Sequence, residues 1–170
     1  NVIKVLVPCG TTGESATLSY EEHDQVIKFC VQKAAKRVKI LAGTGSNSTD
    51  EAITLTKYAK EAGADGALLI TPYYNKPTQE GMYLHFKKIA ETVDIPQILY
   101  NVPGRTGVNL LPETVIRLSK VKNIVGIKEA SGNLEQVSQI VQKTDQSFSL
   151  LSGEDSLTFP ILALGGQGVI

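Results

Sequence analysis

The 170-residue chain has no net formal charge, because 17 lysines and arginines balance 17 aspartates and glutamates. The basic residues are scattered among acidic ones, so the positive surface that holds a phosphate backbone is missing and we predict no nucleic-acid partner. No apolar run approaches the roughly 20 residues of a membrane-spanning helix, and no charged leader precedes an apolar segment. We therefore expect a cytoplasmic protein without a membrane partner.

Residues that bind metals are also few. The two cysteines, Cys9 and Cys30, lack the paired spacing of a zinc site, and we interpret both as free thiols in a reducing compartment. The two histidines, His23 and His85, each lie within a helical pattern, and we expect solvated or half-buried structural roles for them. The sequence therefore predicts no metal site.

Short apolar runs recur along the chain, and helical patterns separate them. The apolar fraction is ordinary for one globular domain with a core. The runs are continuous instead of alternating, which is typical of strands buried on both faces of a parallel sheet. We predict strands at 2–7, 38–42, 66–70, 97–100, 124–127 and 148–151, with a short one at 168–170.

The helical patterns carry recognisable start and stop signals. Ser19 with Glu22, and Ser48 with Glu51, have the spacing of a capping box, and Gly63 stands where a left-handed cap ends a helix. The strand-then-helix unit recurs roughly every 25 to 30 residues, which implies right-handed crossovers. Two architectures are built in this way, the doubly wound sheet and the eight-stranded barrel.

Glycines and polar side chains follow nearly every predicted strand. A barrel's active face requires this arrangement, whereas a crevice at a switch point involves only two strands. The segment 43–45 is a poor dinucleotide fingerprint because the third glycine of that motif is absent. We therefore predict an α/β fold, a TIM (β/α)8 barrel. The polar segments are 10–14, 43–45, 71–75, 101–107, 128–132 and 152–155.

One lysine, Lys128, stands at the carboxyl end of an apolar run, where the sequence turns polar. Burial there would favour the neutral amine, and a neutral amine attacks a ketone to form a Schiff base. A lysine that only ends a strand and reaches back to water is the alternative that this stretch leaves open. The choice between these two interpretations of Lys128 depends on the surrounding motifs.

Four motifs together resemble those of the 4-hydroxy-tetrahydrodipicolinate synthase (dihydrodipicolinate synthase) family, in order and along the whole chain. The resemblance implies a pyruvate-dependent class I aldolase-type barrel that condenses pyruvate with L-aspartate 4-semialdehyde in lysine biosynthesis. It implies no cofactor beyond the covalent Schiff base with pyruvate. The motifs are Gly10-Thr-Thr-Gly-Glu-Ser15, Thr71-Pro-Tyr-Tyr-Asn-Lys-Pro77, Tyr100-Asn-Val-Pro-Gly-Arg-Thr-Gly107 and Gly126-Ile-Lys-Glu-Ala-Ser-Gly132.

The resemblance assigns catalytic roles to four residues. Lys128 matches the Schiff-base lysine, and Tyr100 matches the proton-shuttling tyrosine, a task that suits a phenol because it both donates and accepts. Thr11 and Tyr74 match its two relay partners. Read without the family, Tyr74 is a surface or interface aromatic and Thr11 a turn residue.

Substrate-binding residues follow in the same way. The turn at Thr11 and Thr12 can direct N–H groups and hydroxyls at the pyruvate carboxylate. Arg105 matches the arginine that grips the carboxylate of aspartate semialdehyde through its planar fork, although an arginine in such a loop can also be merely solvated. Gly153 and Ile170 match positions that approach the substrate through main-chain atoms.

A second set of residues matches positions that bind the feedback inhibitor L-lysine at the subunit interface in lysine-sensitive members. A carboxylate with amide and phenol neighbours suits an ammonium group, but Tyr20 departs from the histidine or tryptophan expected in sensitive enzymes. The alternative for each residue is ordinary surface or capping chemistry. The set comprises Ser15, Ala16, His23, Asn47, Glu51 and Tyr73.

The chain is shorter than the about 250 residues of a complete barrel. We expect residues 1–170 to be a partial catalytic barrel domain that covers about strands 2 to 8 and lacks the first strand, the first helix and the C-terminal part. Unpaired edges would make an isolated fragment prone to aggregate. The resemblance also implies a homotetramer, a dimer of dimers, in which Tyr74 completes a neighbour's site.

Two other functions stay open at this point. A different pyruvate-lysine barrel, such as N-acetylneuraminate lyase or a keto-deoxy sugar acid aldolase, would share Lys128 and Tyr100. The paired threonines and Arg105 favour the synthase, because a polyol substrate calls for more hydroxyl-binding groups. An inert fragment or binding paralogue is the non-enzymatic alternative, and the retained proton-transfer groups count against an evolved pseudoenzyme.

Overall fold

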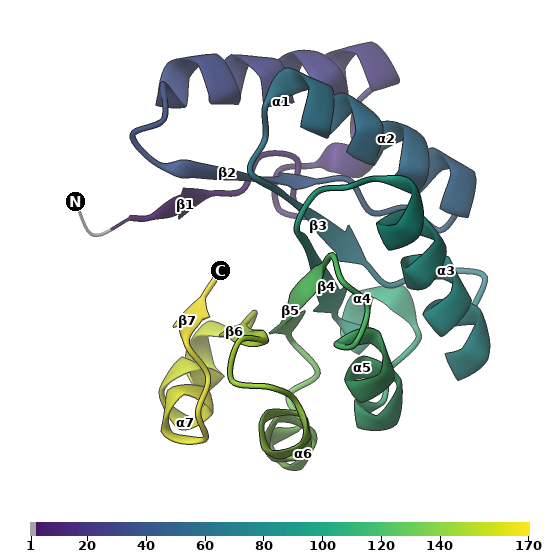
Figure 1. Cartoon of the computed structure of the whole chain (residues 1–170), viewed down its shortest axis with the longest axis vertical. Coiled ribbons are helices and arrows are strands. Elements are labelled where there is room, and N and C mark those ends of the chain that lie inside the picture. The colour runs from purple at the N-terminus through teal and green to yellow at the C-terminus, as the bar shows by residue number, and fades with distance from the viewer. Residues whose placement is uncertain (1–2) are drawn as a thin grey trace.

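The computed structural model describes residues 3–170, which form one parallel sheet of seven strands in the order β1-β2-β3-β4-β5-β6-β7. Because neighbours in the chain are neighbours in the sheet, the doubly wound alternative is excluded. The sheet curls with its helices on the outside, and the two edge strands, β1 and β7, lie at the open side of the curl (Figure 1). The prediction of an open part of a (β/α)8 barrel is thus confirmed.

The predicted strands agree with the structure to within two residues, except at the start. A strand was predicted over 2–7, but only Val5–Leu6 pairs, and Val2 lies outside the described residues. Among residues 3–170, no helix combines the length and apolar character needed to cross a membrane.

The strands are β1 (Val5–Leu6), β2 (Lys39–Gly43), β3 (Gly66–Ile70), β4 (Gln97–Asn101), β5 (Ile124–Glu129), β6 (Ser149–Ser152) and β7 (Gly168–Val169). The helices are η1 (Ser15–Thr17), α1 (Tyr20–Ala34), α2 (Thr49–Ala62), α3 (Gln79–Thr92), α4 (Pro103–Thr106), α5 (Pro112–Leu118), α6 (Leu134–Lys143), η2 (Asp155–Leu157) and α7 (Thr158–Ala163).

One of the two predicted capping boxes forms completely. The Ser19 hydroxyl accepts from the Glu22 amide, and the Glu22 carboxylate accepts from the Ser19 amide, so two free donors at the start of α1 are satisfied. The second box was wrong in one half. Ser48 caps α2 by accepting from the Glu51 amide, but the Glu51 carboxylate turns away to other partners. Gly63 ends α2 in the left-handed conformation, as predicted.

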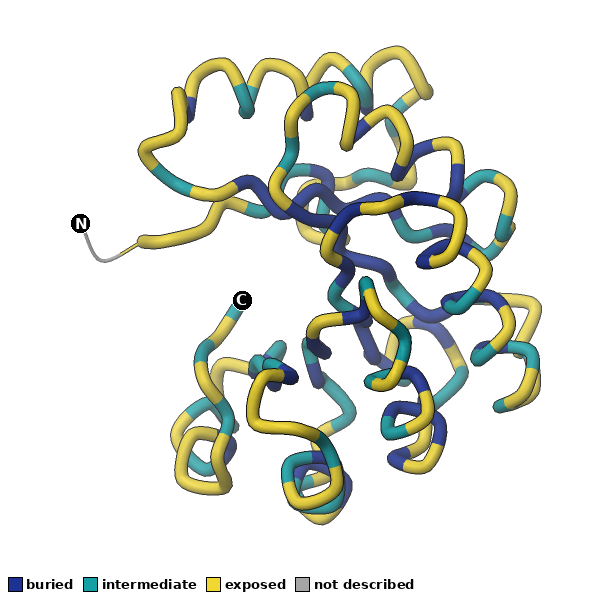
Figure 2. Tube along the Cα trace, viewed as in Figure 1, coloured by how far each residue is buried: buried dark blue, intermediate teal, exposed yellow. Residues whose placement is uncertain are grey.

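Side chains alternate between two apolar regions along each central strand. Leu69, Leu99 and Ile127 belong to the core between the sheet and the helices. Leu68 and Tyr100 belong to a second cluster on the inner side of the curl. Buried residues accordingly follow the sheet, and exposed residues follow the outer faces of the helices (Figure 2). Burial on both faces explains why the strands read as continuous apolar runs.

The expectation that both histidines are solvated or half-buried was wrong. His23 is 4% exposed, and its Nε2 lies 2.9 Å from the Gly43 carbonyl oxygen. His85 is 6% exposed, and its Nδ1 lies 2.9 Å from the Thr49 hydroxyl. Burial lowers the pKa of His85 to about 4, so this ring is neutral at physiological pH. Both histidines therefore lie on the buried face of their helix, and one ring nitrogen of each has a hydrogen-bond partner.

Candidate active site

A one-residue shift in strand register brings Tyr100 and Lys128 together. Between Gln97 and Ile98 the pairing of β4 with β5 slips by one residue, which is the mark of a β-bulge. Beyond the slip, Tyr100 pairs with Lys128. Without it Tyr100 would pair with Ile127, whose side chain belongs to the opposite face of the sheet. The bulge therefore places both polar side chains inside the curl, at the carboxyl ends of their strands.

The Lys128 amine is half-buried and lies over the Tyr100 ring, with Nζ 4.2 Å from the ring centroid. Burial lowers the pKa of Lys128, and the nearby positive charge of Arg105 lowers it further, while Asp155 acts in the opposite direction. The neutral, nucleophilic form is therefore more populated than it is for a lysine in water.

Tyr100 is the acid beside the Lys128 base. Burial raises the pKa of Tyr100, and Arg105 and the Thr11 hydroxyl partly offset that rise. The phenol therefore stays protonated at neutral pH and can donate its proton to a developing oxyanion. The pair thus combines an available lone pair on nitrogen with an available proton on oxygen, which is what addition to a ketone requires.

Gly153, directly after β6, leaves the space that Lys128 occupies. A Cβ at this position would lie 2.8 Å from Cε of Lys128 and 3.0 Å from Cβ of Ala130. The Gly153 amide also donates to the Glu129 carbonyl at 2.9 Å. Ile170 packs against the inner cluster that contains Tyr100. Both residues thus border the same inner space as the lysine and the tyrosine.

The other sequence-predicted site residues lie on loops at the same end of the sheet. Thr11 and Thr12 are exposed in the turn after β1, and Arg105 is exposed on α4. Tyr74 is different, because its side chain is 89% exposed and the chain does not fold it onto Tyr100. Its φ of 73° is in the left-handed region, and its main-chain amide donates to the Thr106 carbonyl oxygen at 3.3 Å.

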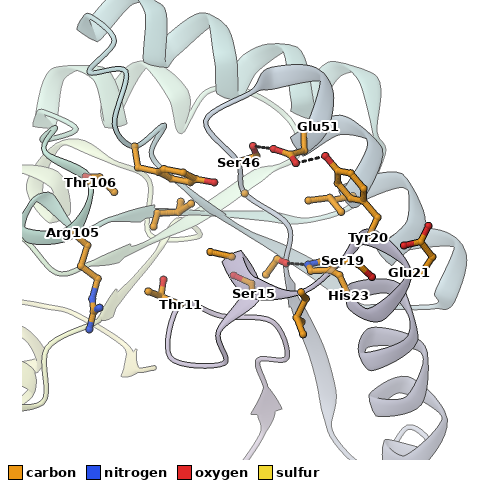
Figure 3. A pocket seen from close by; sticks show the side chains of 17 residues that line it. Thr11, Ser15, Ser19, Tyr20, Glu21, His23, Ser46, Glu51, Arg105 and Thr106 are labelled. Carbon is orange, nitrogen blue, oxygen red and sulfur yellow. Dashed lines mark hydrogen bonds between the residues drawn. The ribbon is translucent and has the colours of Figure 1, made fainter.

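A cavity of about 550 Å³ contains five of the six residues of the predicted lysine site: Ser15, Ala16, His23, Glu51 and Tyr73 (Figure 3). The Glu51 carboxylate accepts hydrogen bonds from the hydroxyls of Ser46 and Tyr20, and these bonds lower the pKa of Glu51. Asn47 lies outside the lining and donates through Nδ2 to the Tyr73 carbonyl at 3.2 Å. The cavity reaches the loops at the carboxyl end of the sheet, because Thr11 and Arg105 also line it.

Sequence reasoning missed a buried polar cluster behind Lys128 and Tyr100. It consists of Asn101, Asn109, Glu129 and Gln136, which hydrogen-bond to one another. One signal was present in the sequence, since Asn101 and Glu129 are polar residues that directly follow the two catalytic candidates at the ends of largely apolar strands. Within residues 3–170 no group of three His, Cys, Asp or Glu side chains is arranged to hold a metal ion.

The fold and this site define a parallel (β/α)-barrel protein with a desolvated lysine at the carboxyl end of one strand and a tyrosine beside it on the next. The chain belongs to the dihydrodipicolinate synthetase family, whose model matches residues 1–170. It is 62% identical over 170 residues to the 4-hydroxy-tetrahydrodipicolinate synthase of Geotalea uraniireducens (strain Rf4), covering 100% of this chain and 59% of that protein.

Solved structures agree with this assignment. The chloride-inhibited dihydrodipicolinate synthase from Acinetobacter baumannii, complexed with pyruvate, superposes with a TM-score of 0.96 at 54% identity, over 98% of this chain and 57% of that one. The enzyme from Cyanidioschyzon merolae with lysine bound gives a TM-score of 0.96 at 48% identity, again over 98% and 57%. The chain therefore spans somewhat more than half the length of the relatives it matches.

Proposed function

We propose that the complete protein containing this chain condenses pyruvate with L-aspartate 4-semialdehyde to give 4-hydroxy-tetrahydrodipicolinate, through a Schiff base on Lys128. The observation that carries the proposal is the half-buried Lys128 amine, 4.2 Å from the centre of the Tyr100 ring. The name of the Geotalea relative and the pyruvate bound to the Acinetobacter enzyme support the same reaction.

In this reaction the neutral Lys128 nitrogen attacks the ketone carbon of pyruvate, and Tyr100 gives its proton to the carbonyl oxygen. Loss of water then leaves a cationic iminium, which draws electrons from the methyl group, so that the methyl proton passes to the Tyr100 phenolate and an enamine forms. The enamine carbon attacks the aldehyde carbon of the second substrate, and the oxygen of that aldehyde takes the proton back from Tyr100. The amino group of that substrate finally replaces Lys128 as the ring closes, which frees the lysine.

The surrounding residues orient the substrates. Thr11 and Thr12 offer hydroxyls and turn amides to the pyruvate carboxylate, and Thr11 also relays protons to Tyr100. Arg105 holds the carboxylate of aspartate semialdehyde through its planar fork. Gly153 and Ile170 approach the substrate through main-chain atoms at the border of the inner space.

Tyr74 acts from a second subunit in this proposal. Its ring is exposed on the loop after β3, so it is available to complete the proton relay of a neighbouring chain instead of its own. A homotetramer arranged as a dimer of dimers would provide that neighbour. The proposal accounts for a large aromatic side chain held outward by a backbone in the left-handed region.

Reductive trapping tests the covalent step. The complete protein, incubated with pyruvate and borohydride, should gain one reduced pyruvate adduct per chain, and peptide mass spectrometry should locate it on Lys128. An adduct on another lysine, or none, contradicts the proposal. Consumption of aspartate semialdehyde should also exceed cleavage of sialic acid, and the reverse order would instead favour N-acetylneuraminate lyase.

We infer that the cavity holding Glu51 binds free L-lysine as an inhibitor, as the lysine-bound structure of the Cyanidioschyzon enzyme suggests. The ammonium group would have to compete with the Tyr20 and Ser46 hydroxyls for the Glu51 carboxylate. Calorimetric titration should therefore show lysine binding that tightens when Tyr20 is replaced by phenylalanine. Undetectable binding to both the unsubstituted and the Tyr20→Phe protein would contradict the regulatory assignment.

A further inference from the structure

Glu129 is a buried carboxylate for which the proposed reaction has no role. It follows Lys128 in β5, is 1% exposed, and belongs to the outer face of the sheet while Lys128 belongs to the inner face. Its oxygens accept hydrogen bonds from the Asn101 amide group at 3.1 and 3.3 Å, from Gln136 Nε2 at 3.0 Å and from the Ser131 main-chain amide at 2.6 Å.

These bonds cross the seam between the two catalytic strands. Asn101 follows Tyr100 in β4 and pairs in register with Glu129, as Tyr100 pairs with Lys128. The side chain of Asn101 also reaches the loop after α4, because it donates to Asn109 Oδ1 at 2.8 Å and accepts from the Leu110 amide at 2.9 Å. One carboxylate thus connects the ends of β4 and β5 with the loop that follows the Arg105 helix.

The hydrogen-bond partners of Glu129 stabilise its ionised form against burial. Burial raises the pKa of Glu129 above its ordinary value, and the hydrogen bonds from Ser131, Asn101 and Gln136 offset only part of that rise. Asn101, Gln136 and the Ser131 main chain each present an N–H group to its oxygens, and such donors favour the carboxylate over the protonated acid. None of the ion pairs in residues 3–170 involves Glu129. A buried carboxylate held by oriented donors loses stabilisation when those donors are displaced.

The Glu129 hydrogen bonds bear on the register between β4 and β5. The register between β4 and β5 changes by one residue after Gln97. If the register at the start of β4 continued to its end, Tyr100 would pair with Ile127 instead of Lys128. The Asn101 and Glu129 side chains meet only in the shifted register. We propose, building on the reaction proposed above, that Glu129 is a positioning residue whose carboxylate holds β4 and β5 in the register that places Tyr100 beside Lys128.

The test uses the complete protein carrying Glu129→Gln, which places an amide donor among the existing donors at unchanged side-chain length. Glu129→Asp keeps the charge but shortens its reach, and serves if the glutamine variant does not fold. Rapid mixing with pyruvate and quenching into borohydride gives two separate quantities, the rate of adduct formation and its final amplitude. The rate at saturating pyruvate should fall about 10- to 100-fold, as expected for a displacement of about 1 Å.

The half-saturating pyruvate concentration should change by less than about twofold, because the Thr11–Thr12 turn lies outside the Glu129 cluster. A merely structural role would lower the amplitude, by unfolding some chains, and leave the rate in the remaining chains unchanged. Thr114→Val is the matched control. It removes a partly buried hydrogen bond to Gln79 on the helical layer and should leave the rate at the value of the unsubstituted protein.

Unchanged rates in both Glu129 variants, or an equal slowing in Thr114→Val, would overturn this inference while the proposed reaction stood. Failure of the unsubstituted protein to form any adduct would overturn the proposed reaction, and this inference with it. A slow rate with full amplitude in the Glu129 variants alone would support the positioning role.

Discussion

Replacing Lys128 by methionine should lower kcat of the complete protein by on the order of 10³-fold or more, about 4 kcal/mol of transition-state stabilisation. Methionine has a similar length and no nucleophilic nitrogen, so neither the Schiff base nor its electron sink can form. The variant should fold normally, because the half-buried position no longer has to desolvate an amine. Steady-state turnover of pyruvate with aspartate semialdehyde and a thermal melt measure the two effects.

Lys122→Met is the matched control for this substitution. Lys122 is exposed, in the turn before β5, so the same change of side chain at the other end of the strand should leave kcat unchanged within about twofold. Turnover by Lys128→Met within tenfold of the unsubstituted protein would show that the nucleophile lies elsewhere.

The same lysine predicts how adduct formation depends on pH. An amine is nucleophilic only above its pKa, so the rate of trapping should rise with pH and then level off. Because burial and the Arg105 charge lower the pKa of Lys128, this rise should lie below the pH range of an ordinary lysine, whose pKa is about 10.4. A rise centred at or above that value would contradict a desolvated amine at this position.

Replacing Tyr100 by phenylalanine should lower kcat about 10²- to 10⁴-fold, the usual contribution of a positioned general acid or base. Phenylalanine keeps the ring that packs in the inner cluster and beneath the Lys128 amine, and removes only the hydroxyl. Borohydride should still trap an adduct on Lys128, but more slowly, since the nucleophile is retained and only its proton donor is lost. Turnover and trapping together therefore separate the two roles.

The control for the tyrosine is Tyr83→Phe. Tyr83 lies in α3 with its ring facing the Arg117 guanidinium at 3.9 Å, and loss of its hydroxyl should not change turnover. Should Tyr100→Phe keep kcat within about threefold of the unsubstituted protein, another group would have to supply the proton.

Much of the fold followed from local patterns. The continuous apolar runs predicted six of the strands to within two residues, because a parallel sheet covered on both faces leaves no solvated side to alternate with. The first strand was predicted too long, since an apolar run cannot show where its pairing partner ends. The burial of His23 was missed for a similar reason. A helix pattern gives the direction of a side chain, but the Gly43 carbonyl that hydrogen-bonds to the buried His23 ring comes from another element.

The residues of the candidate site also fall into those that local patterns predicted and those that they did not. Lys128, Tyr100 and Arg105 stood out because they interrupt apolar runs or follow them in recognisable motifs. Glu129 did not, although it is adjacent to Lys128, because its partners Asn101 and Gln136 are 28 and 7 residues away in the chain. The second capping box failed because the Glu51 carboxylate found the Tyr20 hydroxyl, 31 residues away, instead of its own helix start.

The sequence by itself determined which residues form strands and helices, which chemical groups stand at the ends of the strands, and the family to which those motifs belong. Only the tertiary structure decided that Tyr100 faces Lys128, because that pairing depends on a one-residue slip between two strands. It also decided that Tyr74 is exposed and that Glu129 is buried among donors. Local propensity acts over a few residues, whereas register, desolvation and hydrogen-bond partners are properties of segments that meet only when the chain is folded.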